Sequence, residues 1–275
     1  MKVQKQRIDI MLVDQGLAET REKAKRSIMA GIVYANEVRL DKPGEKIPED
    51  TILTIKGNVL PYVSRGGLKL EKALKHFRIN VEEKKMIDVG SSTGGFTDCA
   101  LQNGAAMSYA VDVGSNQLAW KLRQDERVVV MEKTNFRYLT PDALIKGLPN
   151  FASIDVSFIS LRIILPVLKT LLLDNSEIIA LVKPQFEAGR DQVGKKGIVR
   201  ESSIHEQVLS RIIEFSYAEG YEVSGATHSP ITGGDGNIEF LLHLKYKRDS
   251  EQLQTPEVNI KAVVKEAHDE LKTAK

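Results

Sequence analysis

The 275-residue chain has a single cysteine, Cys99, and therefore no internal disulfide. It also lacks a long hydrophobic run. The most apolar stretch, residues 158–173, contains Arg162 and Lys169 and is shorter than the roughly 20 residues that span a bilayer. The chain begins MKVQKQR without an apolar segment behind the charges, so we expect no secretory signal. These absences argue against a secreted or membrane-spanning protein and favour a cytoplasmic one.

Metal-binding and nucleophilic patterns are missing as well. The histidines, His76, His205, His228, His243 and His268, are scattered without the spacing of metal ligands, and no nucleophile, histidine and acid arrangement emerges. Cys99 stands beside Ala100 and Leu101 in an expected helix, which favours a small buried side chain. The sequence therefore predicts no metal site.

Charge is unevenly distributed along the chain. Residues 1–85 hold 18 Lys and Arg against 12 Asp and Glu, whereas residues 86–275 hold 21 against 25. The positive N-terminal third favours a polyanionic partner, although such an excess is often only a solvated surface.

Residues 86–98, MIDVGSSTGGFTD, are typical of a strand that turns into a helix around a ligand. Gly90, Gly94 and Gly95 let the main chain approach a bound molecule closely, and the helix would present unpaired N–H groups to it. Asp88 would repel a pyrophosphate, so a cationic, phosphate-free ligand fits better. S-adenosylmethionine is the leading candidate, and a tight turn without a ligand is the alternative.

The predicted cofactor contacts extend beyond this loop. Asp112 ends the next expected strand, 24 residues after Asp88, where a carboxylate can hold both ribose hydroxyls of an adenosyl group. A surface-turn aspartate is the alternative. Asn135 follows the third strand, where adenine contacts usually arise. The full predicted set is Asp88, Gly90, Ser91, Thr93, Gly94, Gly95, Phe96, Asp112 and Asn135.

Strand-like and helix-like segments alternate from residue 86 onward. We expect strands at residues 86–90, 109–113, 128–132, 152–158, 178–183, 222–227 and 238–246. This alternation predicts an open α/β sheet that binds ligands at the carboxyl ends of its strands. The last two strands follow each other directly and predict an antiparallel hairpin that closes the sheet.

Charged residues interrupt three of the apolar runs. They are Asp155, Lys183 and Glu239, and charges embedded in buried strands are costly unless they are paired or functional. Each alone could be a structural ion pair. Together with Lys69, near the start of an expected helix, they give the order Lys, Asp, Lys, Glu.

Residues 5–57 have a pattern of their own, with two short helices followed by short β-segments. The motifs RxD at 7–9, GLA at 16–18, TR at 20–21, GxV at 31–33 and DxI at 50–52 resemble the RNA-binding module named after ribosomal protein four of the small subunit. That resemblance implies phosphate contacts, which position an RNA without reading its sequence. An exposed helix face is the alternative. The implied contacts are Arg7, Arg21, Lys23, Lys25 and Arg26.

Residues 64–246 look like the FtsJ-type 2′-O-ribose methyltransferases, through the segments SRGGLK, DVGSSTGGFTD, DVSFIS, VKPQFE and GNIEF. With the N-terminal module, the whole chain resembles the TlyA family, often labelled haemolysin. The resemblance implies a Rossmann-like class I methyltransferase sheet with a small α+β RNA-binding domain. It also implies S-adenosylmethionine as cofactor, ribosomal RNA or ribosomal subunits as partner, and 2′-O-methylation of cytidine. The implied catalytic tetrad is Lys69, Asp155, Lys183 and Glu239.

We therefore expect an RNA-binding domain at residues 1–57, a linker at 58–63, a methyltransferase domain at 64–246 and a polar tail at 247–275, which carries a helix-like apolar stripe. Further RNA contacts are expected at Arg65, Lys195, Lys196 and Arg200. A solvated loop is the alternative for the last three.

The tetrad suits ribose methylation because a ribose hydroxyl is a very weak acid. Lys183 is expected either to take the hydroxyl proton or to stay protonated and steer the hydroxyl. Asp155 would orient that ammonium, while Lys69 and Glu239 would position the ribose. The rival functions are a membrane-active haemolysin and a catalytically idle RNA-binding assembly factor.

Overall fold

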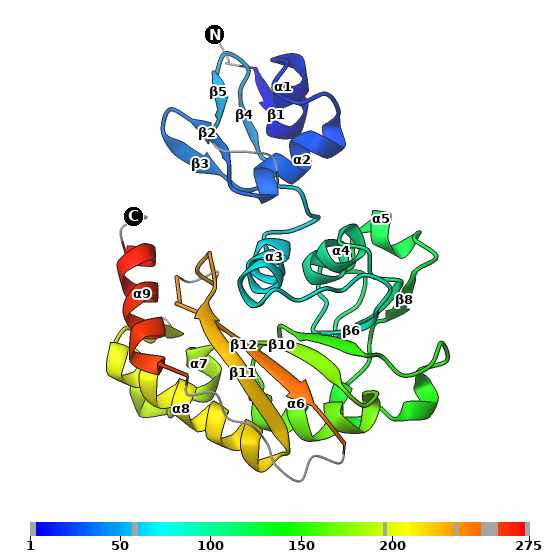
Figure 1. Ribbon diagram of the computed structural model, residues 1–275. Coiled ribbons are helices and arrows are strands. Elements are labelled where there is room, and N and C mark those ends of the chain that lie inside the picture. The colour runs from blue at the N-terminus through cyan, green and yellow to red at the C-terminus, as the bar shows by residue number, and fades with distance from the viewer. Residues whose placement is uncertain (1–3, 57–59, 195–196, 234–235, 249–257, 273–275) are drawn as a thin grey trace. The chain divides into compact units, whose positions relative to one another are not determined.

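The computed structural model describes residues 4–56, 60–194, 197–233, 236–248 and 258–272 (Figure 1). The chain divides into two compact units, residues 1–65 and residues 66–275. The predicted linker, residues 58–63, thus lies at the end of the first unit, and its first two residues fall outside the described ranges.

The first unit is a small α+β domain. Strands β1 (Lys5–Arg7) and β4 (Lys46–Pro48) pair antiparallel, and β2 (Val33–Ala35) pairs antiparallel with both β3 (Val38–Leu40) and β5 (Leu53–Ile55). Helices α1 (Ile8–Asp14) and α2 (Arg21–Met29) pack on each other around a buried apolar cluster that includes Leu12, Ile28 and Leu53. Thr20 caps α2 because its hydroxyl oxygen accepts the Lys23 N–H at 3.2 Å.

The second unit is built on a seven-stranded sheet in the order β11-β12-β10-β9-β6-β7-β8. The strands are β6 (Lys85–Val89), β7 (Met107–Val111), β8 (Val128–Met131), β9 (Phe151–Ile154), β10 (Ser176–Val182), β11 (Tyr221–His228) and β12 (Phe240–Tyr246). Neighbouring strands from β10 to β8 pair parallel, and β12 pairs antiparallel with both of its neighbours. The predicted α/β sheet with a small α+β N-terminal domain is confirmed.

Helices cover both faces of this sheet (Figure 1). They are α3 (Gly66–Phe77), α4 (Gly95–Gln102), α5 (Trp120–Arg123), α6 (Leu161–Leu168), α7 (Pro184–Glu187), α8 (Ser202–Ala218) and α9 (Ile260–Lys272). Short 3-10 turns lie at Phe136–Tyr138, Pro141–Ala143, Lys169–Leu171 and Arg190–Gln192. Helices α3 and α4 pack together on one face, and α6 and α8 pack together on the other.

Burial on both faces explains why the central strands read as continuous apolar runs. Strand β10 is buried at every position except Glu177, and β9 is buried throughout. One large apolar cluster joins the inner strands to α6, α8 and α9, and it includes Val264 and Ala267 of α9. The carboxyl ends of the parallel strands are thereby fixed in space, and the candidate site lies there.

The predicted antiparallel hairpin of the last two strands is confirmed. Strand β12 lies between β10 and β11, so β11 forms the edge of the sheet. The strand predicted at 152–158 is too long: β9 ends at Ile154, and Phe158 has a backbone φ of 62° that no strand allows. Asp155, Lys183 and Glu239 accordingly lie one residue outside their strands and not within them.

Among the described residues, no helix is both long enough and apolar enough to cross a membrane.

Candidate active site

The loop between β6 and α4 has the backbone that its glycines predict. Gly90 and Gly94 have φ angles of 85° and 94°, in the left-handed region that favours glycine. A Cβ atom on Gly90 would lie 2.5 Å from the carbonyl oxygen of Asp155, so no other residue fits there. The loop therefore packs directly against the residue that follows β9.

Asp88 supports this loop from its buried side. Its carboxylate is fully buried and accepts hydrogen bonds from the Thr97 N–H at 3.1 Å, the Thr97 hydroxyl at 2.8 Å and the Ser153 hydroxyl at 2.7 Å. Burial raises the pKa of Asp88 to about 6, against the effect of these hydrogen bonds. The Asp88 carboxylate thus holds the start of α4 and strand β9 together. Because it has no exposed surface, it cannot make the direct ligand contact expected of it in this structure.

Asp112 is placed differently, directly after β7. Its carboxylate is half-buried and accepts the backbone N–H groups of Ser92 at 2.8 Å and Gly114 at 2.7 Å. A carboxylate has about four acceptor positions, so acceptor capacity remains for ribose hydroxyls. Val113 beside it is 73% exposed, so its side chain is open to contact with an adenine ring. These residues fit an adenosyl ligand.

The other predicted cofactor residues divide by burial. Ser91 and Phe96 are buried, Thr93 is half-buried, and the Thr93 carbonyl accepts the Ala119 N–H at 3.1 Å. Asn135 is exposed, and its side-chain oxygen accepts the Arg137 N–H at 3.2 Å, which leaves its amide N–H groups for a ligand. Phe96, with its ring in the core, supports the loop from inside.

Sequence reasoning missed Glu132, the residue after β8. Its carboxylate accepts the backbone N–H groups of Asn116, Gln117 and Leu118 and pairs with Arg123 at 2.6 Å. The Arg123 guanidinium and these N–H groups lower the pKa of Glu132 to about 2. Glu132 thus fixes the segment after Asp112, and its position after a strand was the only sequence signal that could have found it.

The four tetrad residues meet at the carboxyl end of the sheet. The Lys69 ammonium lies 2.7 Å from Glu239 Oε2 and 3.5 Å from Asp155 Oδ2, and the Lys183 ammonium lies 2.5 Å from Asp155 Oδ1. Lys69, Lys183 and Glu239 are buried, and Asp155 is half-buried. The structure therefore brings together residues from α3, β9, β10 and β12 in a chain of alternating charge.

Mutual pairing keeps the central charges ionised despite burial. Burial alone would lower the pKa of Lys69, but the charges of Asp155 and Glu239 outweigh it and the pKa is raised. Burial alone would raise the pKa of Asp155, but Lys69 and Lys183 outweigh it and the pKa is lowered. The tetrad thus keeps Lys69 and Asp155 charged, and the amino group of Lys183 lies on the other side of the Asp155 carboxylate.

The loop after β9 brings two more residues to this point. Ser157 accepts a 3.1 Å hydrogen bond from Lys183, and Phe158 is 90% exposed although the chain has few aromatic residues. The rings of Phe158 and Phe186 lie 5.0 Å apart. A bulky residue at a left-handed φ with an exposed ring is strained, which is typical of functional positions.

In the first unit, one buried carboxylate holds two of the predicted RNA contacts. Asp9 accepts bonds from Arg7 Nε at 2.9 Å and from Arg21 at 3.0 Å. The Arg7 hydrogen bonds, helped by Arg21 and opposed by burial, lower the pKa of Asp9 to about 2. Both arginine side chains remain partly exposed, so each can offer its outer edge to a phosphate.

The remaining predicted RNA contacts are on α2 and in two loops. Lys23 pairs with Glu19 and Lys25 with Glu22, while Arg26 forms no ion pair with any described residue. Arg65 and Arg200 are exposed. Asn237, two residues before Glu239, bonds to Gly197 and Val199 and so brings the Arg200 segment beside the tetrad. Lys195 and Lys196 lie outside the described residues.

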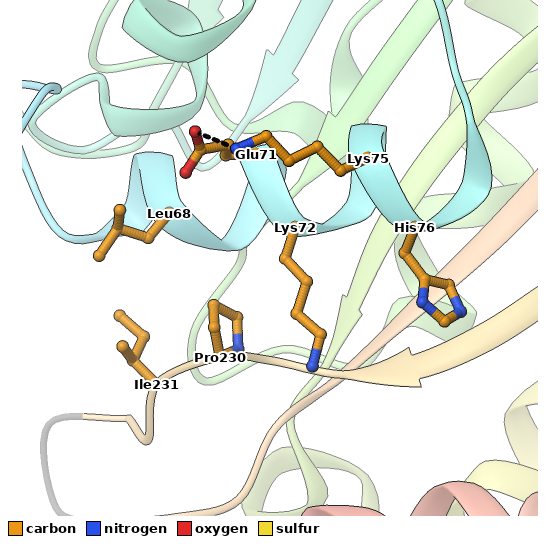
Figure 2. Close-up of a pocket in the computed structure, with 7 residues that line it drawn as sticks. All are labelled: Leu68, Glu71, Lys72, Lys75, His76, Pro230 and Ile231. Carbon is orange, nitrogen blue, oxygen red and sulfur yellow. Dashed lines mark hydrogen bonds and ion pairs between the residues drawn. The ribbon is translucent and has the colours of Figure 1, made fainter.

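A groove is lined by α3 and by Pro230 and Ile231 (Figure 2). Lys75 turns back to Glu71 at 2.7 Å, and Lys72 extends away from this pair. The Lys72 ammonium lies 3.0 Å from Nε2 of the buried His228, near Glu266 and Glu270 of α9. The side chains of His228, Glu266 and Glu270 lie close enough together to hold a metal ion. The Lys72 ammonium already supplies a positive charge at this point.

Comparison with known proteins gives two family matches. Residues 62–246 match the FtsJ-like methyltransferase model, and residues 6–53 match the S4 domain. A presumed rRNA methyltransferase of Bacillus subtilis, YqxC, is 69% identical over 100% of this chain and 98% of its own length. The 16S/23S rRNA (cytidine-2′-O)-methyltransferase TlyA of Mycobacterium tuberculosis is 41% identical over 88% of this chain and 91% of its own length.

A solved structure of a Streptococcus thermophilus protein, described as a presumed hemolysin, also resembles the chain. It has a TM-score of 0.78 and 56% identity and covers 99% of this chain and 98% of its own. At this identity and coverage the likeness extends over both units.

Proposed function

The chain belongs to the FtsJ-like methyltransferases and, with its S4 domain, to the TlyA group within them, and from this premise we propose that it methylates the 2′-hydroxyl of cytidine in ribosomal RNA. The observation that carries the proposal is the contact between the glycine loop and the tetrad. Gly90 lies so close to the Asp155 carbonyl that methyl donor and ribose would meet at one point. Such proximity is a main source of catalysis in a transfer reaction.

The cofactor of this family, S-adenosylmethionine, supplies a methyl group that its sulfonium charge has already activated. The residues proposed to hold it are Asp112, at the ribose, the backbone of the 90–95 loop, and Asn135, near the adenine. Asp88 supports them by fixing the loop from the buried side.

The tetrad residues are proposed to prepare the ribose oxygen for attack. Two of the three N–H groups of Lys183 are directed to Asp155 and Ser157, which leaves the third for the 2′-oxygen. If Lys183 acts as the base, its neutral amine takes the hydroxyl proton as the oxygen attacks the methyl carbon. If Lys183 stays protonated, that proton passes to water, and the ammonium stabilises the negative charge that develops on the oxygen. Lys69 and Glu239 hold Asp155 in place from the other side.

Phe158 is proposed to receive the target base. Its exposed ring lies three residues after Asp155, and base stacking on an aromatic ring is worth about 1–3 kcal/mol. A base held there keeps its ribose near Lys183. The energy also helps to offset the unstacking of the nucleotide from its neighbours.

The first unit is proposed to hold the RNA backbone. Arg7 and Arg21, fixed by Asp9, and the α2 cations Lys23, Lys25 and Arg26 would contact phosphates. Arg200, whose segment is tied to Asn237, would extend these contacts near the active site, and Arg65, Lys195 and Lys196 are proposed as further phosphate contacts. With rRNA as its substrate, the protein is proposed to act in the cytoplasm.

The proposal is tested by incubating purified small and large ribosomal subunits with the protein and methyl-deuterated S-adenosylmethionine. Nuclease digestion and mass spectrometry then locate the label. We expect deuterated 2′-O-methylcytidine, and none with a Lys183→Met variant. No label in either subunit would favour an idle assembly factor. Leakage from liposomes that persists in the Lys183→Met variant would favour the membrane-active alternative.

A further inference from the structure

One buried carboxylate joins the two loops that carry Asp155 and Lys183. Glu187 lies four residues after Lys183, at the end of α7. Its Oε2 accepts a 2.6 Å hydrogen bond from the Ser160 hydroxyl, and its Oε1 accepts a 2.7 Å bond from the Leu161 N–H. Ser160 and Leu161 begin α6, directly after the Asp155 loop. Glu187 therefore fastens the end of one active-site loop to the other.

The position of Glu187 is energetically expensive. Its side chain is buried, and burial raises the pKa of this carboxyl even though Ser160, Leu161 and the charge of Arg162 act in the opposite direction. Its hydrogen-bond donors are the neutral Ser160 hydroxyl and Leu161 N–H, and no lysine or arginine among the described residues forms an ion pair with it. A buried carboxylate without a paired cation lowers the stability of the fold. We therefore look to its two hydrogen bonds, which hold the start of α6, for its role.

The loop it fastens is strained. Residues 155–160 are fixed at one end by β9 and at the other end by Glu187. Between these ends, Phe158 has a φ of 62°, which costs about 1–3 kcal/mol in a bulky residue. Without the second anchor, the chain can relieve this strain by moving Phe158 to an ordinary backbone conformation.

Other contacts cross between the same two loops. Lys183 bonds to Asp155 at 2.5 Å and to Ser157 at 3.1 Å, and the Phe158 ring lies 5.0 Å from the Phe186 ring. Of these partners, Ser157 and Phe158 lie closest to the end that Glu187 holds. The positions of Ser157 and Phe158 therefore depend strongly on Glu187. The position of Asp155 depends on it less, because Asp155 directly follows β9.

We propose that Glu187 is a positioning residue, which keeps Phe158 against Phe186 and Ser157 against Lys183 by holding the start of α6. Its predicted effect on activity rests on the proposed methyl transfer, whereas its effect on the two phenylalanine rings does not. Loss of Glu187 moves the rings apart and weakens substrate turnover, and leaves the Asp112 side of the site unchanged.

The test uses the full chain labelled with 4-fluorophenylalanine. The ¹⁹F signals of Phe158 and Phe186 are assigned with Phe158→Leu and Phe186→Leu variants. Glu187→Ala is expected to shift both signals and to lower kcat/KM for the RNA by about tenfold or more, with cofactor affinity unchanged. Glu187→Gln retains an oxygen that accepts the Leu161 N–H and is expected to rescue part of both effects.

The matched control is Asn150→Ala at the opposite end of the sheet. The Asn150 side chain likewise accepts a backbone hydrogen bond, from the Lys85 N–H at 2.9 Å. Its loss is expected to leave both ¹⁹F signals and kcat/KM unchanged.

The proposal is overturned if a folded Glu187→Ala protein keeps both ¹⁹F signals and its kcat/KM at the wild-type values. If that variant does not fold, Ser160→Ala, which removes the hydroxyl that bonds to Glu187, decides: shifted signals support the positioning role, and unchanged signals contradict it. If the wild-type protein transfers no methyl group, the proposed function fails. The ¹⁹F signals still show whether Glu187 holds the Phe158 and Phe186 rings in place.

Discussion

Each unit of the protein contains an aspartate that bridges two cations, but the two bridges lie in different surroundings. Asp155 joins Lys69 to Lys183 where both lysines are buried, whereas Asp9 joins Arg7 to Arg21 where both arginines are partly exposed. A buried ammonium group can interact with only one substrate atom at a fixed position. An exposed guanidinium group can bind any phosphate that reaches it.

The residue types agree with this division. Lysine is a compact charge that can exchange a proton, while arginine stays charged and offers a planar set of donors. Under the proposed function, the same carboxylate bridge would serve chemistry in the second unit and attachment to RNA in the first. Changes to the Asp155 bridge should therefore alter rate, and changes to the first unit should alter RNA affinity and stability.

The largest effect is expected from Lys183→Met. Removing the ammonium should lower the single-turnover rate by about 10²–10⁴-fold, the usual contribution of proton transfer to or from a reacting group. RNA and cofactor affinities should stay unchanged. The control is Lys84→Met, because Lys84 pairs with Glu177 at the other end of the sheet. If the Lys183→Met rate is near that of wild type, the Asp155 bridge has no special role in the reaction and no longer differs from the Asp9 bridge in this respect.

Lys183→Arg distinguishes the two roles expected of this residue. If Lys183 takes the hydroxyl proton, the arginine variant should be as inactive as the methionine variant, because arginine does not deprotonate. If Lys183 only steers the hydroxyl, the arginine variant should keep measurable activity. A rate measured from pH 6 to pH 10 would report the difference.

A smaller effect is expected from Phe158→Ala. Loss of a stacking surface worth about 1–3 kcal/mol should raise KM for the RNA by roughly 5- to 150-fold. The free energy of unfolding should not fall, since the ring is exposed and its backbone is strained. Ile145→Ala, which removes another exposed apolar side chain, is the control. Equal KM values for the two variants would exclude the stacking role.

Asp9→Asn should destabilise the first unit by about 2 kcal/mol, since a pKa lowered from 3.8 to about 2 corresponds to roughly 1.4 kcal/mol per unit. A carboxyl whose pKa is lowered on folding contributes stability above its unfolded pKa. This contribution should therefore be lost as pH falls from about 4 to about 2. Hydrogen exchange of α1 amides in the full chain measures it.

The exposed Asp14 of the same helix gives the control, because Asp14→Asn removes only a hydrogen bond from Gln6. Equal amide protection in the two variants would mean that Asp9 does not organise this unit.

The smallest effect is expected from Lys23→Gln. Its ion pair with Glu19 is exposed, so stability should change by less than about 1 kcal/mol. If Lys23 contacts a phosphate, the slope of log affinity against log salt should fall by about 1. An unchanged slope would remove Lys23 from the RNA-binding surface without affecting Arg7 or Arg21.

The sequence predicted the order of strands and helices and the four tetrad residues because these features are local. The apolar runs, the glycine loop and the charges at strand ends can each be read from a few neighbouring residues. The position of β12 inside the sheet was not predicted. It depends on which strand edge remains available after the other strands have paired.

Residues whose roles depend on distant partners were also missed. Glu132 binds the N–H groups of a loop that precedes it by 14 to 16 residues, and Glu187 binds the start of a helix 26 residues earlier. Asp88 was expected to face the ligand because a carboxylate before Gly90 suits a cationic molecule. In the structure this carboxylate is buried and bonded to Ser153, which is 65 residues away. Local pattern cannot reveal such contacts.

The most direct test of the account is to measure single-turnover rate and RNA affinity separately on two variants. One is Lys183→Met, and the other combines Lys25→Gln with Arg26→Gln, which leaves the Asp9 bridge intact. The account predicts that the first loses rate and keeps RNA affinity, while the second loses RNA affinity and keeps its rate at saturating RNA. The opposite pattern, or loss of both quantities in each variant, would contradict it.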